Sequence, residues 1–225
     1  MMEAIEKSKF SPDLRRRIEI VRAEMRSRID EGIKYTDRMI ENLHGGIVGI
    51  FVNRLALFIF AWLGRDRARE EGIREIDHAI YVAAQCVHDE GANLDDLIDK
   101  NFNGYLKHHP LYRRCDMDHP RFNDITALMR EGLKTRADFY YQLLRRDAGC
   151  YEDLLKTAFP NKEDSMRVVD RQHEIVQEAF ELVSREKELL KVPSIIRRDV
   201  LKIIRRTDDY GNSRLKKRIN EIYGN

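Results

Sequence analysis

Histidines gather in one part of this sequence, where their spacing could support metal chemistry. Five of the seven lie between residues 78 and 119. A cysteine and two aspartates fall in the same stretch, so that six side chains within a dozen residues can bind a metal. These candidates are His108, His109, Cys115, Asp116, Asp118 and His119. Imidazole, thiolate and carboxylate are the donors that zinc, iron and manganese take in proteins.

Two prolines stiffen the loop that carries these side chains. Pro110 follows His109 and Pro120 follows His119, so less chain entropy is lost when ligands converge. We therefore predict a divalent metal site whose ligands come from the loop: His108, His109, Cys115 and His119. The spacing matches no zinc template, and adjacent histidines tend to point apart. A polar loop between helices, with accidental histidines, is the alternative interpretation.

A His-Asp pair, His88 and Asp89, follows an apolar helical run and precedes a stop signal at Gly91. This pattern resembles the HD-domain family of all-helical, metal-dependent phosphohydrolases. In that family a histidine on an earlier helix, the His-Asp pair and a distant aspartate hold one or two divalent ions. The resemblance implies the following ligands here: His44, His88, Asp89 and Asp138, with His108, His109 or His119 for a second ion.

The same resemblance implies a reaction. A bound divalent ion lowers the pKa of its water ligand, and its charge complements phosphoryl oxygens. The implied activity is metal-dependent hydrolysis of a nucleotide or a related phosphate ester. A histidine at a helix end also interacts favourably with the helix dipole, so a structural cap is the alternative for His88. Whether the chain is an enzyme stays open at this point.

Three other patterns occur in helical enzymes. Pairs at i and i+3 put a carboxylate and an imidazole on one helix face, as in di-iron bundles. They are Glu41 with His44, Glu75 with His78, and Asp170 with His173. Residues 95–99 copy an aspartate motif of prenyl-diphosphate enzymes, but acids in a first helical turn also stabilise the helix dipole. Arg followed four to six residues later by His, as in some ribonucleases, is too frequent here to discriminate.

The composition indicates a helix-rich globular protein. Charged residues make up 36% of the chain and aromatic residues 8%, with only 12 glycines and 5 prolines. A chain of 225 residues can bury a full core without disulfides or a structural metal. The three cysteines are odd in number and form no Cys-x-x-Cys pair, which favours reduced thiols. Because the N-terminus shows no secretory pattern, we expect a cytoplasmic protein.

Residues 45–63 are almost wholly apolar and approach the length of a membrane span. Asn53 and Arg54 lie at the middle of this stretch. An Arg at a bilayer centre costs about 2.5 to 3.5 kcal/mol on the mildest scale, and no second span could shield it. We therefore predict no membrane insertion and a buried central helix over residues 47–63.

Helix start and stop signals divide the rest of the chain. Ser11-Pro12 begins a long amphipathic helix, whose apolar stripe serves the core or a homodimer. A helix of about 25 residues ends at Gly91, and Asn93 caps the next one. Further helices are expected over 124–146, 151–158 and 162–190, and two short ones over 194–223, parted at 208–212. The prediction is an all-α fold, a single helical domain of about eight helices around the central one.

The C-terminal segment is basic. From residue 191 onward ten Lys or Arg oppose four acids, so we predict a core over residues 1–190 and a basic arm over 191–225. Such an arm favours nucleic acid or an acidic protein partner, and the chain would then be a non-catalytic interaction protein. The candidate contacts are Arg197, Arg198, Arg205, Arg206, Lys216 and Lys217. A solvated helix face is the alternative.

Overall fold

The structure, a computed structural model, describes residues 9–42, 65–109, 112–191 and 194–224. Within these ranges it contains seven α-helices, one 3-10 helix and no strand except an isolated bridge between Cys115 and Leu190. They are α2 (Pro12–Asn42), α4 (Arg65–His88), α5 (Leu94–His108), η1 (Tyr112–Arg114), α6 (Phe122–Leu144), α7 (Tyr151–Ala158), α8 (Lys162–Arg185) and α9 (Ser194–Tyr223). The all-α prediction is confirmed. The apolar stretch 47–63 lies outside the described residues.

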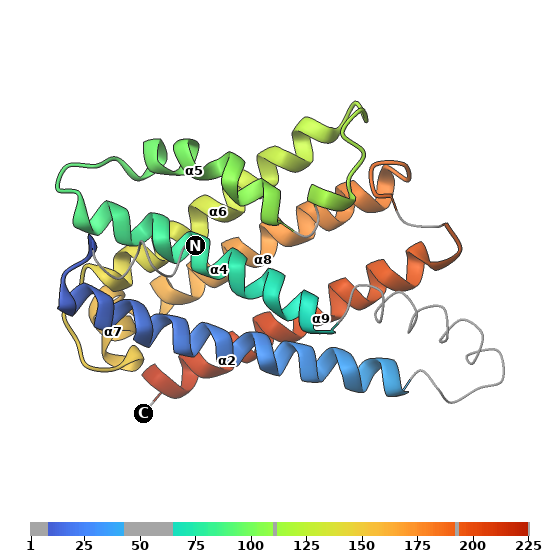
Figure 1. The fold of residues 1–225 in the computed structure, drawn as a ribbon. Coiled ribbons are helices and arrows are strands. Elements are labelled where there is room, and N and C mark those ends of the chain that lie inside the picture. Colours follow the sequence, from blue (N-terminus) through green and yellow to red (C-terminus); the bar gives the residue numbers. More distant parts are fainter. Residues whose placement is uncertain (1–8, 43–64, 110–111, 192–193, 225) are drawn as a thin grey trace.

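Helix α6 holds the central position among the described helices. It contacts α2, α4, α5, α7 and α8 (Figure 1). Helix α4 also packs on α2 and α5, while α9 packs on α8, α2 and α7. In Figure 1, α5 lies along the top of the molecule, and α2 lies along the bottom beside α9.

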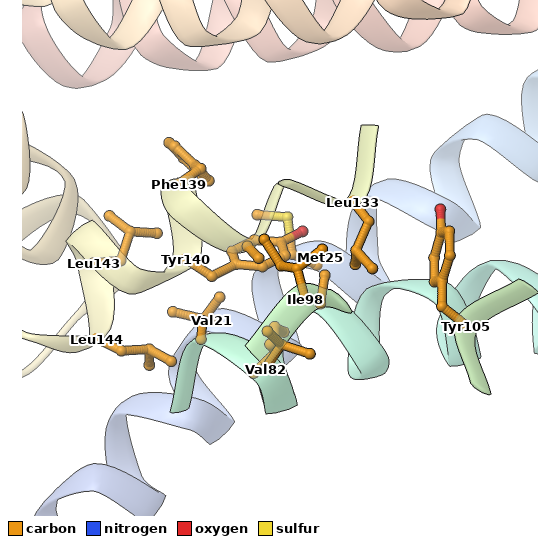
Figure 2. Packing of buried hydrophobic residues seen from close by; sticks show 14 of the residues in the cluster. Val21, Met25, Val82, Ile98, Tyr105, Leu133, Phe139, Tyr140, Leu143 and Leu144 are labelled. Carbon is orange, nitrogen blue, oxygen red and sulfur yellow. The ribbon is translucent and has the colours of Figure 1, made fainter. Parts of the chain in front are cut away.

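The core consists mainly of aliphatic side chains, together with buried aromatic rings such as those of Phe139 and Tyr140 (Figure 2). Val21 of α2, Val82 of α4 and Leu133 of α6 are fully buried in it. Burial of one such side chain contributes roughly 1.5 to 3 kcal/mol relative to exposure. The apolar stripe of α2 therefore packs into the core of the described fold, which is one of the two roles that the sequence predicts for it.

Local capping explains two helix starts that the sequence predicts. Oγ of Ser11 accepts a hydrogen bond from the backbone N–H of Leu14 at 3.2 Å, and α2 begins at Pro12. Oδ1 of Asn93 accepts one from Asp95 N–H at 2.8 Å. Gly91, which has a φ of 85°, provides the left-handed turn between α4 and α5. Both N-caps are thus confirmed.

The C-terminal segment differs from the prediction. Instead of two short helices parted at 208–212, α9 is one helix of 30 residues. A Gly within a helix costs about 1 kcal/mol relative to Ala, which favours a break near Gly211. Tertiary contacts outweigh this preference: the ring of Tyr210 stacks on that of Tyr35 of α2, with centroids 4.0 Å apart. Ile219 and Ile222 are buried in the core.

Two further helices have different bounds from those predicted. Helix α8 ends at Arg185 and does not reach Leu190, because Leu190 joins the bridge to Cys115. Helix α6 covers residues 122–144, a shift of two residues toward the N-terminus. None of the described helices combines the length and apolar character that crossing a bilayer requires.

Candidate metal centre

Helices α8 and α9 are antiparallel, and polar side chains lie along the seam between them. Asp170 of α8 pairs with Lys216 of α9, and His173 and Gln177 both contact Asp208. Further along α8, the ring of Phe180 packs against Arg205. His173 and the neighbouring Asp208 and Asp209 form a group whose ligand atoms lie within 4.8 Å of one another. Elsewhere among the described residues, no three His, Cys, Asp or Glu side chains meet this spacing.

The two nitrogens of His173 have different partners. Nδ1 lies 2.7 Å from Oδ2 of Asp208, and Nε2 lies 3.8 Å from Oδ1 of Asp209. The first distance is a hydrogen bond, in which the imidazole donates to the carboxylate. This bond leaves Nε2 as the nitrogen with a free lone pair and fixes the orientation of the ring. Gln177 Nε2 donates to the same Asp208 oxygen at 3.1 Å.

The distance from His173 Nε2 to Asp209 Oδ1 is too long for a hydrogen bond but suits a shared ion. Bonds from zinc to imidazole nitrogen or carboxylate oxygen are about 2.1 Å long, so one ion can contact both atoms across 3.8 Å. A carboxylate behind the imidazole is the usual support of a metal-binding histidine. Asp208 would have that supporting role, and His173 and Asp209 would bind the ion.

Burial and charge also distinguish the two aspartates. The side chain of Asp208 is 24% exposed and that of Asp209 is 52% exposed. Burial raises the pKa of Asp208, and the favourable interactions with His173 and Gln177 offset this only in part. A divalent cation nearby would favour the charged form of both carboxylates. Asp209 is the more exposed of the two, so an ion bound there would be open to solvent.

Asn212 follows these aspartates by one helical turn. Its Oδ1 is buried and has no hydrogen-bond partner among the described residues. An unsatisfied buried oxygen costs about 1 to 3 kcal/mol, and amide oxygens are accepted ligands of hard divalent ions. At i+4 from Asp208 and i+3 from Asp209, Asn212 lies on the same face of α9 as both. A donor set of imidazole, carboxylate and amide oxygen suits Mn²⁺ or Zn²⁺.

The described ligands that the HD-domain resemblance implies are His88, Asp89 and Asp138, and their ligand atoms do not all lie within 4.8 Å of one another. His88 Nε2 lies 4.0 Å from Asp89 Oδ1, and the His88 ring packs edge-on against Phe10. Asp138 accepts a hydrogen bond from Gln142 at 3.4 Å. Burial raises the pKa of the Cys86 thiol, and the charges of Asp138 and Asp89 act in the same direction. His44 lies outside the described residues.

The metal ligands predicted in the loop between α5 and α6 have separate partners in the structure. His109 caps α5 and lies 3.7 Å from Glu75, and burial lowers its pKa. Cys115 is buried, which raises its pKa to about 11. His119 Nδ1 accepts a hydrogen bond from Arg121 N–H at 3.1 Å. His108 ends α5, and its side chain is outside the description.

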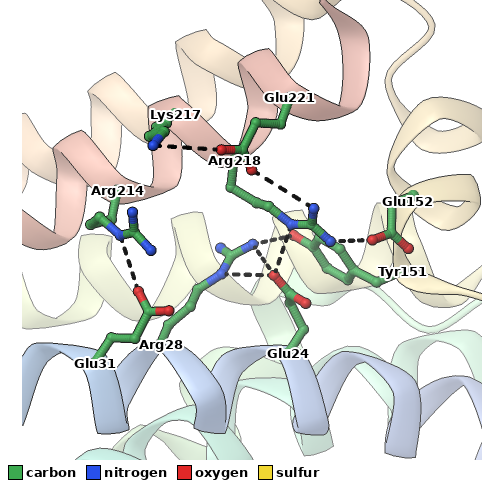
Figure 3. A network of polar contacts seen from close by, with 9 residues as sticks. All are labelled: Glu24, Arg28, Glu31, Tyr151, Glu152, Arg214, Lys217, Arg218 and Glu221. Carbon is green, nitrogen blue, oxygen red and sulfur yellow. Dashed lines mark hydrogen bonds and ion pairs between the residues drawn. The ribbon is translucent and has the colours of Figure 1, made fainter.

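Some of the predicted basic contacts bind partners within the described structure, and others are exposed to solvent. Most cations in the second half of α9 form internal ion pairs, several of them in one network with α2 and α7 (Figure 3). The pairs are Arg214 with Glu31, Lys216 with Asp170, Lys217 with Glu221, and Arg218 with Glu24 and Glu152. Arg197 donates to backbone carbonyls at the end of α8. Arg205 and Arg206 are exposed, and the side chain of Arg198 is not described.

Sequence reasoning singled out His173, but with Asp170 as its partner. In the structure Asp170 pairs with Lys216, and the carboxylates beside His173 come from α9. No protein-family model matches this chain, and no curated protein or solved structure was found to be similar to it.

Proposed function

We propose that this chain is a metal-dependent phosphohydrolase that acts on a nucleotide or a related phosphate ester, with its ion bound between α8 and α9. One observation carries the proposal: His173 Nε2 and Asp209 Oδ1 are 3.8 Å apart, while Asp208 holds the other nitrogen of the ring. The ligand set differs from the one that the HD-domain resemblance implies. A divalent ion remains the expected cofactor.

The chemistry needs only the ion and water. Held by His173 and Asp209, the ion would lower the pKa of a water ligand toward 7 and so supply the nucleophile at neutral pH. The reaction would form one bond from the water oxygen to phosphorus and break the ester P–O bond, and the leaving oxygen would take up the proton that the water gives up. Asp208 acts as a positioning residue, because it fixes which nitrogen of His173 faces the ion.

Equilibrium dialysis against Mn²⁺ or Zn²⁺ tests the ligand set. We expect His173→Ala and Asp209→Asn to lose the bound ion, and Asp208→Asn to lower metal affinity by about 10- to 100-fold. The matched controls are His119→Ala and Asp89→Asn, which leave this seam intact. Hydrolysis of p-nitrophenyl phosphate should follow metal content. Full metal uptake by Asp209→Asn would refute this ligand set. Loss of metal uptake in Asp89→Asn would instead favour the ligand set that the HD-domain resemblance implies.

A non-catalytic interaction protein is the second candidate. It is supported by the exposed side chains of Lys202 and Arg206, which form no ion pair within the described part of the chain. Binding to nucleic acid should then weaken linearly with the logarithm of salt concentration. Replacement of both residues by Gln would flatten that dependence, as measured by fluorescence anisotropy. A homodimer through α2 is a separate proposal, which sedimentation of the full chain tests.

A further inference from the structure

Three cations lie within the two turns before the metal centre on α9: Lys202, Arg205 and Arg206. We call them the basic turn. All three are exposed, and none forms an ion pair with another described residue. The cations further along α9 behave differently, because Arg214, Lys216 and Arg218 are held by carboxylates of α2, α8 and α7.

Two acids of α8 on either side of Phe180, Glu178 and Glu181, have cationic partners on their own helix. Glu178 pairs with Arg171 at 3.4 Å, and Glu181 pairs with Arg185 at 2.9 Å. The positive charge of the basic turn is therefore available to a ligand. A guanidinium binds a phosphate group with two parallel hydrogen bonds, which makes Arg the preferred residue for this task.

Arg205 lies on the same helix face as Asp209, four residues earlier. One helical turn, about 5.4 Å along the axis, separates the two positions. The guanidinium of Arg205 lies 5.8 Å from the ring centroid of Phe180 on α8, so it is held over the seam that contains the metal centre. A phosphate bound to an ion at Asp209 could reach this guanidinium. Lys202 lies two turns from Asp209 on the same side.

We propose that the substrate carries at least two linked phosphates, with the first bound by the ion and Arg205 and the next by Lys202 and Arg206. This inference rests on the proposed function, since it needs the ion. A single phosphate group carries about −1.5 to −2 charges at neutral pH. The ion (+2), its carboxylate ligand Asp209 (−1) and Arg205 (+1) together carry about +2, which balances that charge. The two remaining cations then match a second phosphate.

The test uses non-hydrolysable probes and Mn²⁺-loaded full-length protein. Methylphosphonate carries one phosphonate group, methylenediphosphonate carries two, and a nucleoside α,β-methylene diphosphate adds the nucleoside. We expect calorimetry to show at least tenfold tighter binding of the diphosphonate than of methylphosphonate. Similar affinities for the two diphosphonates would assign recognition to the phosphates, and a tighter nucleoside probe would add contacts to the nucleoside. Manganese retained by the protein is measured after each titration.

Two variants test which residues of the basic turn bind the first phosphate and which bind the second. Arg205→Gln should weaken binding of both phosphonates about tenfold, while Lys202→Gln with Arg206→Gln should weaken only the diphosphonate. Arg74→Gln, on α4, is the matched control for loss of an exposed Arg. Equal affinities of the unsubstituted protein for one and two phosphonate groups, with Mn²⁺ retained, would overturn this inference alone. Failure of that protein to bind Mn²⁺ would overturn it together with the proposed function.

Discussion

The carboxylate of Glu75 and the guanidinium of Arg136 form an ion pair between α4 and α6. Tyr105 of α5 donates its hydroxyl hydrogen to the same carboxylate at 2.9 Å. His109, at the end of α5, lies 3.7 Å away. One carboxylate thus links three helices in the interior, and its charge state affects the stability of the whole described core.

Folding stability should depend on the ionisation of Glu75. Burial opposes its charged form, but the charge of Arg136, with His109 and the Tyr105 hydrogen bond, outweighs burial and lowers the pKa from 4.5 to about 2. Between these values the unfolded chain binds more protons than the folded one, so stability falls as pH decreases from 4.5 toward 2. Urea titrations across this range should show the loss. Glu75→Gln should reduce this pH dependence, whereas Glu70→Gln, on the surface, should keep it.

Breaking the Glu75 pair should cost more than replacing it. Glu75→Gln leaves the Arg136 charge without its partner, and we expect a loss of about 3 to 5 kcal/mol in unfolding free energy at pH 7. The double variant Glu75→Leu with Arg136→Met removes both charges and should be more stable than the single variant. Chemical denaturation of all three proteins measures this difference. A double variant as unstable as the single one would contradict the expectation.

Metal binding should stabilise the seam between α8 and α9. An ion that binds only the folded state adds about 2.7 kcal/mol at a concentration 100 times its Kd. We therefore expect Mn²⁺ to raise the Tm of the unsubstituted protein but not that of Asp209→Asn. Asp138→Asn, on α6, is the control that should still respond. An equal rise in all three proteins would indicate binding elsewhere.

Arg197 should determine the stability of the end of α8. Its guanidinium donates to the carbonyl oxygens of Glu186 at 2.9 Å and Leu190 at 3.3 Å, and also to those of Val183 and Lys187. Hydrogen bonds from a charged donor contribute about 1.5 to 3 kcal/mol. Arg197→Ala should lower stability by roughly that amount and increase hydrogen exchange over residues 183–190. Arg206→Ala, which lacks such contacts, should change neither.

Leu133 reports on core packing at the centre of the described fold. Its side chain is fully buried in α6 (Figure 2). Leu133→Ala removes buried surface and leaves a cavity, for which we expect a loss of about 2 to 5 kcal/mol by denaturant titration. Met117→Ala is the control, because Met117 is 55% exposed and should change stability by less than about 0.5 kcal/mol.

Sequence reasoning predicted the parts of the fold that depend on local chemistry. The caps at Ser11 and Asn93 and the turn at Gly91 follow from side-chain and backbone preferences of single residues. The continuity of α9 does not, because it depends on Tyr35, which lies 175 positions before its partner Tyr210. Propensity alone favours a break there.

The candidate centre was only partly accessible from the sequence for a related reason. The spacing of Asp170 and His173 indicates His173 as a possible ligand, whereas the sequence around Asp208 and Asp209 predicts a helix break. Asp208 is 35 positions away on another helix, and no short motif joins the two. Only the packing of α9 on α8 brings these side chains together. A dense run of histidines is a weaker guide, since His109 and His119 have different neighbours.

The pairing of Arg214 with Glu31 joins positions 183 residues apart. The entropy of closing so long a loop must be offset before such contacts become favourable. We therefore expect α9 to dock on α2 late in folding, after α4, α5 and α6 have assembled through nearer contacts. In kinetic terms, substitutions at this junction should accelerate unfolding and leave the folding rate nearly unchanged.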